Sequence, residues 1–331
     1  MKMRSCLFAL VFAAAPVAFC QQGVLGGPVS GYVYDAQAHV LRPVQGIPGA
    51  SLLGDPIDLG MEVNAAYVSP RQDSAFAMSA DGGAHFFRLD SGKATEVSLD
   101  GLAGARGDVA FSPSGTAAAI YEAGRVRVVT GLPDAPKMGD EIDIGQSGRV
   151  HALAVSDDGK LVLASVGGGV HLLSPYGENV SLVSVSDHAL VAFAPAGHDG
   201  AVADATRAGL VLFRDLAGGA APNVLATPDA LSAPTGLAFS ADGARLFLAD
   251  SSGSIASFDL AAGSRADIAC NCVPTGLSPM GRLFRVNEPG ASPLWLLDAS
   301  GSTARMIFVP AAHSDSSLPH VERRVSVLPK R

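Results

Sequence analysis

The sequence predicts an all-β chain built from one repeated unit, and three observations support this. The residues are 48% apolar and only 16% charged, and 38 Gly and 21 Pro are spread along the chain. No window of a dozen residues keeps apolar positions at helical spacing without an interrupting Gly or Pro. The stretch LAFSADGARLFLAD, residues 237–250, recurs in related forms at a nearly constant interval, which is typical of repeat architectures.

Each copy of the unit consists of two apolar runs joined by a small polar turn. One turn residue per copy serves as a marker, and the mean interval between markers is about 42 residues, within the range of known repeats. The markers are Ser69, Ser112, Ser156, Ala194, Ser240 and Ser278. A second landmark in register with the first ends a later apolar run of each copy. These landmarks are Asp90, Thr130, Ser174, Asp215, Asp259 and Asp298.

The turn residues have a direct physical explanation. In Ser-Pro-x-Gly the Ser caps backbone N–H groups, Pro presets φ near −65°, and Gly takes the left-handed conformation that other residues resist. The copy that contains Gln72 in place of Gly predicts a looser turn. The predicted structural turn glycines are Gly115, Gly159, Gly197, Gly243 and Gly281.

The apolar runs on either side of each turn predict strands that are buried on both faces. Each unit then supplies an inner strand, a second strand, a third strand and an outer strand. Four-stranded units of about 40 residues arranged around an axis form a β-propeller. Six units span residues 62–310, and residues 31–57, with Asp35 after an apolar run, imply another.

We therefore predict a β-propeller of seven four-stranded blades. The N-terminal strands and a returning strand near residues Val321 to Leu328 would close the ring. The alternative is a ring of six blades with the early segment lying across one face. Because Gly and Pro recur at every unit boundary and no linker stands out, residues 21–331 are predicted to form a single domain.

On these strand and turn motifs the chain resembles extracytoplasmic bacterial β-propeller repeat proteins of the WD40-like, TolB-like and YVTN-lactonase-like superfamily. The resemblance covers nearly the whole of residues 21–331. The Trp-Asp and Gly-His pairs of WD40 repeats are absent, which disfavours the cytoplasmic WD40 branch. The resemblance implies the fold, and the function has to be argued from a site.

The N-terminus has the pattern of a secretory signal peptide. Lys2 and Arg4 precede an apolar run over residues 6–19, which is shorter than the roughly 20 residues of a membrane-spanning helix. We expect residues 1–20 to be removed, which predicts a periplasmic or secreted protein with no transmembrane segment after cleavage. The alternative is that Cys20 carries the lipid of a bacterial lipoprotein.

The overall charge argues against nucleic acid as a partner. The formal net charge is −8, and no stripe of Lys and Arg follows one predicted face. The basic end of the chain is predicted to be a solvated strand and tail. It contains Arg323, Arg324, Lys330 and Arg331.

Cys270 and Cys272 are the cysteines that remain after residues 1–20. A local disulfide, two unpaired structural thiols, and a metal or redox role all stay open. In a straight strand the Cα atoms of residues i and i+2 lie near the upper limit for a disulfide, so that pairing would need a bend. A metal site would need two further ligands, and no partner motif lies nearby.

Other polar motifs have structural explanations. Asp140, Glu141 and Asp143 could hold Ca²⁺ through oxygen atoms, but their spacing lacks the EF-hand order, so a solvated loop is predicted. Residues 79–87 fit an Asp-box pattern, which predicts a tight turn. His85 and His171 fall on predicted third strands as hydrogen-bonded imidazoles. No catalytic, cofactor-binding or metal-ligating residue is predicted.

Two functions follow. The first is a non-catalytic scaffold without a cofactor that binds a protein, peptide or glycan. The second is a lactonase-like or related hydrolase with a divalent metal, such as calcium, in the central channel. Three or more Asp, Glu, Asn or His side chains that converge in the channel would favour the hydrolase. An apolar channel would favour the scaffold.

Overall fold

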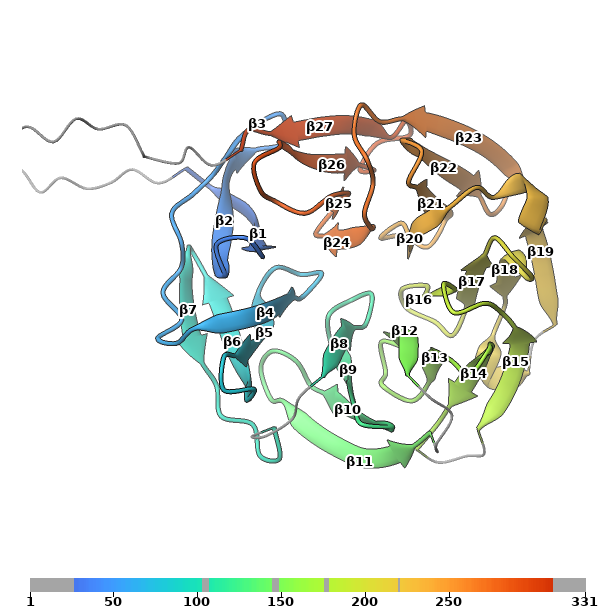
Figure 1. The fold of residues 1–331 in the computed structure, drawn as a ribbon, viewed down its shortest axis with the longest axis horizontal. Helices are drawn as coiled ribbons and strands as arrows, with labels where there is room; N and C mark the ends of the chain where they lie inside the picture. Colours follow the sequence, from blue (N-terminus) through green and yellow to red (C-terminus); the bar gives the residue numbers. More distant parts are fainter. Residues whose placement is uncertain (1–26, 103–106, 145–148, 176–178, 220, 312–331) are drawn as a thin grey trace, which may run out of the picture.

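Seven small antiparallel sheets stand around a central axis in the computed structural model (Figure 1). The structure describes residues 27–102, 107–144, 149–175, 179–219 and 221–311. The helices within these ranges are two short 3-10 turns, η1 (Leu216–Gly218) and η2 (Pro228–Ala230). The predicted all-β propeller with seven blades is confirmed. The predicted signal peptide, Cys20 and the predicted closing strand lie outside the described residues.

Blades 2 to 7 each contain four strands that follow one another from the axis outward. Blade 2 contains β4 (Val63–Val68), β5 (Ser74–Ser79), β6 (Ala84–Asp90) and β7 (Lys93–Glu96). Blade 3 contains β8 (Asp108–Phe111), β9 (Ala117–Glu122), β10 (Arg125–Thr130) and β11 (Lys137–Asp143). Blade 4 contains β12 (Val150–Val155), β13 (Val162–Val166), β14 (Gly169–Leu173) and β15 (Val180–Ser184).

The remaining three four-stranded blades follow the same order. Blade 5 contains β16 (Leu190–Phe193), β17 (Gly200–Asp204), β18 (Gly209–Phe213) and β19 (Pro222–Ala226). Blade 6 contains β20 (Pro234–Phe239), β21 (Arg245–Asp250), β22 (Ser254–Asp259) and β23 (Ser264–Ala269). Blade 7 contains β24 (Ser278–Met280), β25 (Leu283–Arg285), β26 (Leu294–Asp298) and β27 (Arg305–Val309).

Blade 1 has three strands among the described residues: β1 (Val29–Asp35), β2 (Val40–Ile47) and β3 (Ala50–Leu53). The sequence of β1 and its turn, GYVYDAQAHVL, matches GAVADATRAGL of the second strand of blade 5. Asp35 and Asp204 correspond, and each carboxylate accepts a hydrogen bond from the N–H two residues further on. The strand β1 therefore occupies the second position of its blade, and no described strand fills the innermost position.

Each neighbouring pair of blades shares one apolar core, and there are seven such cores among the described residues. The core that joins the last blade to the first contains Val33 and Val44 with Met280, Leu294 and Leu296. Burying a side chain of this size contributes about 1.5–3 kcal/mol. Because strands are buried on both faces, their sequences read as continuous apolar runs.

The predicted turn chemistry is largely confirmed in the backbone. The N–H of Ser112 bonds to the carbonyl of Ala117, and the same closure recurs in blades 4 and 6. Positive φ angles occur at Gly115 (71°), Gly159 (70°), Gly243 (69°) and Gly281 (64°). These positions disfavour any residue with a Cβ atom.

Two predictions about the turns are wrong. Gly197 does not take the left-handed conformation; the preceding Ala196 does, with φ 56°. Gln72 does not make a looser turn, since it has φ 64° and its N–H bonds to the Ser69 carbonyl at 2.8 Å, as at the glycine positions.

The later landmarks lie where they were predicted, at the ends of third strands. Two other predictions need correction. Ser278 is not a turn residue, because it lies in β24 and the turn of blade 7 is shortened to Gly281 and Arg282. The carboxylates at 140, 141 and 143 lie in the outer strand β11 and not in a loop.

Candidate functional site

A cavity of about 600 Å³ lies at the centre of the ring, within the range of ligand pockets. The innermost strands of blades 2 to 7 form its wall, and β1 completes it on the side of blade 1. Seven blades thus contribute to one site, although they are far apart in the sequence. One wall residue from each blade illustrates this: Tyr34, Ala66, Ala110, Leu153, Val191, Leu237 and Leu277.

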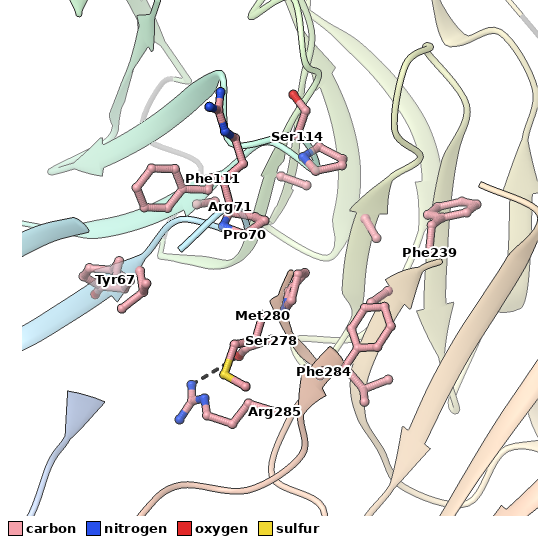
Figure 2. Close-up of a pocket in the computed structure, with 18 of the residues that line it drawn as sticks. Tyr67, Pro70, Arg71, Phe111, Ser114, Phe239, Ser278, Met280, Phe284 and Arg285 are labelled. Atoms are coloured by element: carbon pink, nitrogen blue, oxygen red, sulfur yellow. Dashed lines mark hydrogen bonds between the residues drawn. The ribbon is translucent and has the colours of Figure 1, made fainter. Parts of the chain in front are cut away.

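The wall of this channel is mainly apolar. Valine, alanine, leucine, phenylalanine and proline predominate, and the described lining contains no Asp, Glu, Asn, His, Lys or Cys. Figure 2 shows Phe111, Phe239, Phe284 and Met280 around the opening. Such a wall favours apolar groups and penalises polar groups that lose hydrogen bonds to water.

Two arginines are the charged members of the lining, and both are held by neighbouring groups. The Nε of Arg71 lies 2.8 Å from a carboxylate oxygen of Asp73. Arg285 donates to Glu288 and, at 3.2 Å, to the hydroxyl of Ser278 (Figure 2). Because each guanidinium has a carboxylate beside it, the rim presents oriented N–H donors with little net charge.

Tyr67 adds a hydroxyl to the lining. This hydroxyl donates to a carboxylate oxygen of Asp108 at 3.2 Å. Burial, together with the negative charge of Asp108, raises the pKa of Tyr67 to about 12. The phenol therefore stays protonated at neutral pH, and the channel gains no anionic oxygen from it.

The face of the ring that carries the turns between first and second strands is here called the turn face. Asp157 ties three of its turns together. One oxygen accepts from the N–H and the hydroxyl of Ser114 at 2.7 and 2.6 Å, and the other accepts from the N–H of Ala196 at 2.8 Å. These bonds hold the mouth of the channel across blades 3, 4 and 5.

Asp158 makes a second tie on the turn face. Its carboxylate accepts from Ser156 at 2.8 Å and lies 3.1 Å from the Nε2 of His198 in the next blade. Burial would raise the pKa of Asp158, but hydrogen bonds from Ser156, the Lys160 N–H and His198 outweigh it and lower the pKa to about 2. The Asp158 carboxylate therefore stays ionised over most of the pH scale.

Gln72 lines the channel and was not predicted as a site residue. Its Oε1 accepts from the N–H of Tyr32 at 2.6 Å, and its Nε2 donates to the carbonyl of Ser69 at 2.9 Å. The available signal was the lack of Gly at this turn position. In the turns of blades 3 and 4 the equivalent Cβ would meet the preceding blade, as at Gly115, where it would lie 2.4 Å from the Ser69 hydroxyl.

Cys270 and Cys272 form a disulfide away from the channel lining, with Cα atoms 5.1 Å apart. They lie in a bend just after β23, which provides the departure from a straight strand that this spacing requires. Gly253 packs against the carbonyl groups of both cysteines. The disulfide fixes the bend at the edge of blade 6.

The other polar motifs are also remote from the channel lining. His85 lies in the third strand β6, with its Nδ1 2.7 Å from Glu96 of β7. In the predicted Asp-box turn the Gly83 N–H donates to Ser79 Oγ at 3.0 Å. Among the described residues no three His, Cys, Asp or Glu side chains are grouped to hold a metal ion.

In the described ranges no helix has the length and apolar character needed to cross a membrane. In comparisons with known proteins, the chain matches no family model and no curated protein. The proposed function therefore rests on the seven-bladed β-propeller and its apolar central channel.

Proposed function

We propose that this protein is a non-catalytic binding scaffold that receives an apolar segment of a peptide or protein in its central channel. The observation that carries the proposal is the 600 Å³ channel with a wall of apolar side chains from all seven blades. A site of this size and character buries apolar groups, and a few polar groups at its rim fix their orientation.

The chemistry of the rim supports a peptide as the ligand. Arg71, Arg285 and the Ser278 hydroxyl offer N–H and O–H groups to the carbonyl oxygens or carboxylates of an extended chain. A glycan fits less well, because its hydroxyl groups would lose hydrogen bonds to water against the apolar wall. The hydrolase alternative lacks support in the described lining, which provides no carboxylate or imidazole to ligate a divalent cation.

The expected location outside the cytoplasm belongs to the same proposal. It is supported by the signal pattern of residues 1–20 and by the disulfide between Cys270 and Cys272, since such bonds persist in oxidising compartments. The resemblance to extracytoplasmic bacterial propellers points in the same direction.

Selection from a displayed library of random peptides on the immobilised protein tests this function. Ala110 lines the channel, is half-buried and belongs to none of the seven cores, so Ala110→Glu places a charge in the wall without disturbing packing. Ala262→Glu, in the exposed turn between β22 and β23, is the matched control.

We expect the selected peptides to be rich in apolar residues. Their affinity, measured by calorimetry, should fall at least tenfold for Ala110→Glu and stay unchanged for Ala262→Glu. Failure to enrich any sequence, or equal affinity for both variants, would overturn the proposal.

A further inference from the structure

A second cavity lies between blade 6 and the link that leads into it. Its volume is about 360 Å³, which is within the range of ligand pockets, and its lining shares no residue with that of the central channel. One side is the link from blade 5, residues 227–233, which contains η2. The other side is the face of blade 6 that packs against blade 5. This cavity therefore belongs to a single boundary between blades.

Strands β21, β22 and β23 form the floor of this cavity and its outer wall. In the register of the sheet Leu248 pairs with Ala256, and Ala256 pairs with Asp267. In the next row Asp250 pairs with Ser254. Because every second residue of a strand faces the same side of a sheet, all five side chains lie on the cavity face. An apolar floor of Leu248 and Ala256 is thus flanked by two carboxylates.

The corresponding place between blades 4 and 5 is filled by apolar side chains. The equivalent row of blade 5 consists of Val202, Val211 and Val224. The link between blades 4 and 5, residues 185–189, packs two buried side chains against this row. In blade 6 the smaller Ala256 corresponds to Val211, the polar Asp267 corresponds to Val224, and the link is longer. These differences account for the cavity.

The outer end of the cavity has an ion pair with a free acceptor. Arg265 donates through Nε and Nη2 to one oxygen of Asp267, at 3.0 and 2.9 Å, and its guanidinium lies over the ring of Phe258. The second oxygen of Asp267 has no partner in the described part of the chain, and this side chain is 56% exposed. The guanidinium is therefore already bound, while one carboxylate oxygen remains available to a ligand.

Asp250 supplies a second negative charge at the inner end. Its two oxygens accept from the N–H groups of Ala233 and Ser252 at 2.9 and 2.7 Å. Burial raises the pKa of Asp250, but these hydrogen bonds outweigh burial and lower the pKa, so the carboxylate is ionised at neutral pH. With two carboxylates and one guanidinium, the cavity has an excess of one negative charge.

We propose that this cavity binds a primary aliphatic amine in its ammonium form. The aliphatic body lies on the floor of Leu248 and Ala256, and the N–H groups donate to the free oxygen of Asp267 and to the hydroxyl of Ser254. The positive charge of the ligand balances the excess negative charge. A sugar fits less well, because its hydroxyl groups would lose hydrogen bonds to water against the apolar floor.

Titration of the full chain with n-pentylamine at pH 7, followed by ¹H–¹⁵N NMR, tests the proposal. The amine is then an ammonium ion, because alkyl amines titrate near the lysine value of about 10.4. We expect saturable shifts of the amide signals of Ser254 and Ala256, while the channel residues Ala110 and Val191 stay unchanged. 1-Pentanol, which has the same chain without the charge, should bind at least tenfold more weakly.

Three variants separate charge from space. Asp267→Asn keeps the shape of the side chain but removes its charge, and should weaken the binding of n-pentylamine at least tenfold. Asp229→Asn is the matched control, because it removes a charge from an exposed position of η2 outside the lining, and should change the affinity less than twofold. Ala256→Val, which copies blade 5, should weaken binding at least threefold by narrowing the floor.

The absence of saturable shifts in blade 6 would overturn the proposal, as would equal affinities for Asp267→Asn and Asp229→Asn or an affinity unchanged by Ala256→Val. Equally tight binding of 1-pentanol would overturn it in favour of an uncharged apolar ligand. Tighter binding of methyl β-glucoside would overturn it in favour of a sugar. These results are independent of the peptide-binding test, which probes the wall of the central channel at Ala110.

Discussion

Asp157 gives the sharpest test of how the channel mouth is held. Its carboxylate accepts three hydrogen bonds from two neighbouring blades, with donor–acceptor distances of 2.6 to 2.8 Å. Hydrogen bonds to a charged group contribute about 1.5–3 kcal/mol each. In Asp157→Asn one acceptor becomes an NH₂ group facing an N–H donor, and the charge is lost.

The expected destabilisation is about 2 kcal/mol, because one bond is lost, the others weaken, and the group is only half-buried. For a domain of this size such a loss lowers Tm by about 4–6 °C. Differential scanning calorimetry measures the shift directly. Asp229→Asn, at an exposed position in η2, is the control and should leave Tm within about 1 °C.

A double-mutant cycle with Ser114→Ala separates this contact from other effects of the substitution. Because Ser114 donates through its hydroxyl to the same carboxylate, the two changes together should destabilise by about 1 kcal/mol less than the sum of the single changes. Equal melting temperatures for Asp157→Asn and the unmodified protein, or strictly additive effects in the cycle, would refute the reasoning.

Three further predictions concern stability. The depressed pKa of Asp158 means that its ionised form adds about 1 kcal/mol of stability after solvent screening. This contribution is present above pH 4 and is lost as the pH falls toward 2. Asp158→Asn should therefore remove this part of the dependence of stability on pH in acid denaturation. Phe76→Ala should lower the free energy of unfolding by about 3–5 kcal/mol, while Phe308→Ala, at a 54% exposed site, should lower it by less than about 1 kcal/mol in urea titrations. Replacing Cys270 and Cys272 by Ser should lower the urea midpoint by the equivalent of about 1–2 kcal/mol, since the closed loop is short, and an unchanged midpoint would contradict this.

The repeat pattern predicted the ring because turn chemistry and burial are local properties. The marker residues Ser69, Ser112, Ser156 and Ser240 lie at the starts of equivalent turns, as their sequences indicate. Strands buried on both faces leave long apolar runs, which a single sequence displays directly. These features determined the number of units and their order around the axis.

Single deviations from the pattern were harder to interpret. Ser278 resembled a turn marker, but blade 7 shortens its turn by two residues, and only the pairing of Met280 with Leu283 reveals this. Gln72 occupies a glycine position because its side chain extends toward blade 1, where it meets Tyr32. Both deviations depend on neighbours that are distant in the sequence.

The details of the channel lining could not be predicted from the sequence. An inner strand of a propeller presents neighbouring residues to different surroundings: Val109 and Phe111 pack into the core between blades 2 and 3, whereas Ala110 between them lies outside that core and borders the channel. Which carboxylates approach the axis depends on turn geometry, and Asp157 and Asp158 turned out to bind neighbouring turns.

Photo-cross-linking with a selected peptide tests most directly whether the channel is the binding site. A peptide with a photoreactive group at its apolar centre is irradiated on the full chain, and the adducts are mapped by mass spectrometry. We predict adducts on residues that border the channel, such as Ala110 and Arg71. Adducts confined to exposed apolar residues of the outer rim, such as Leu52 and Phe308, would contradict it.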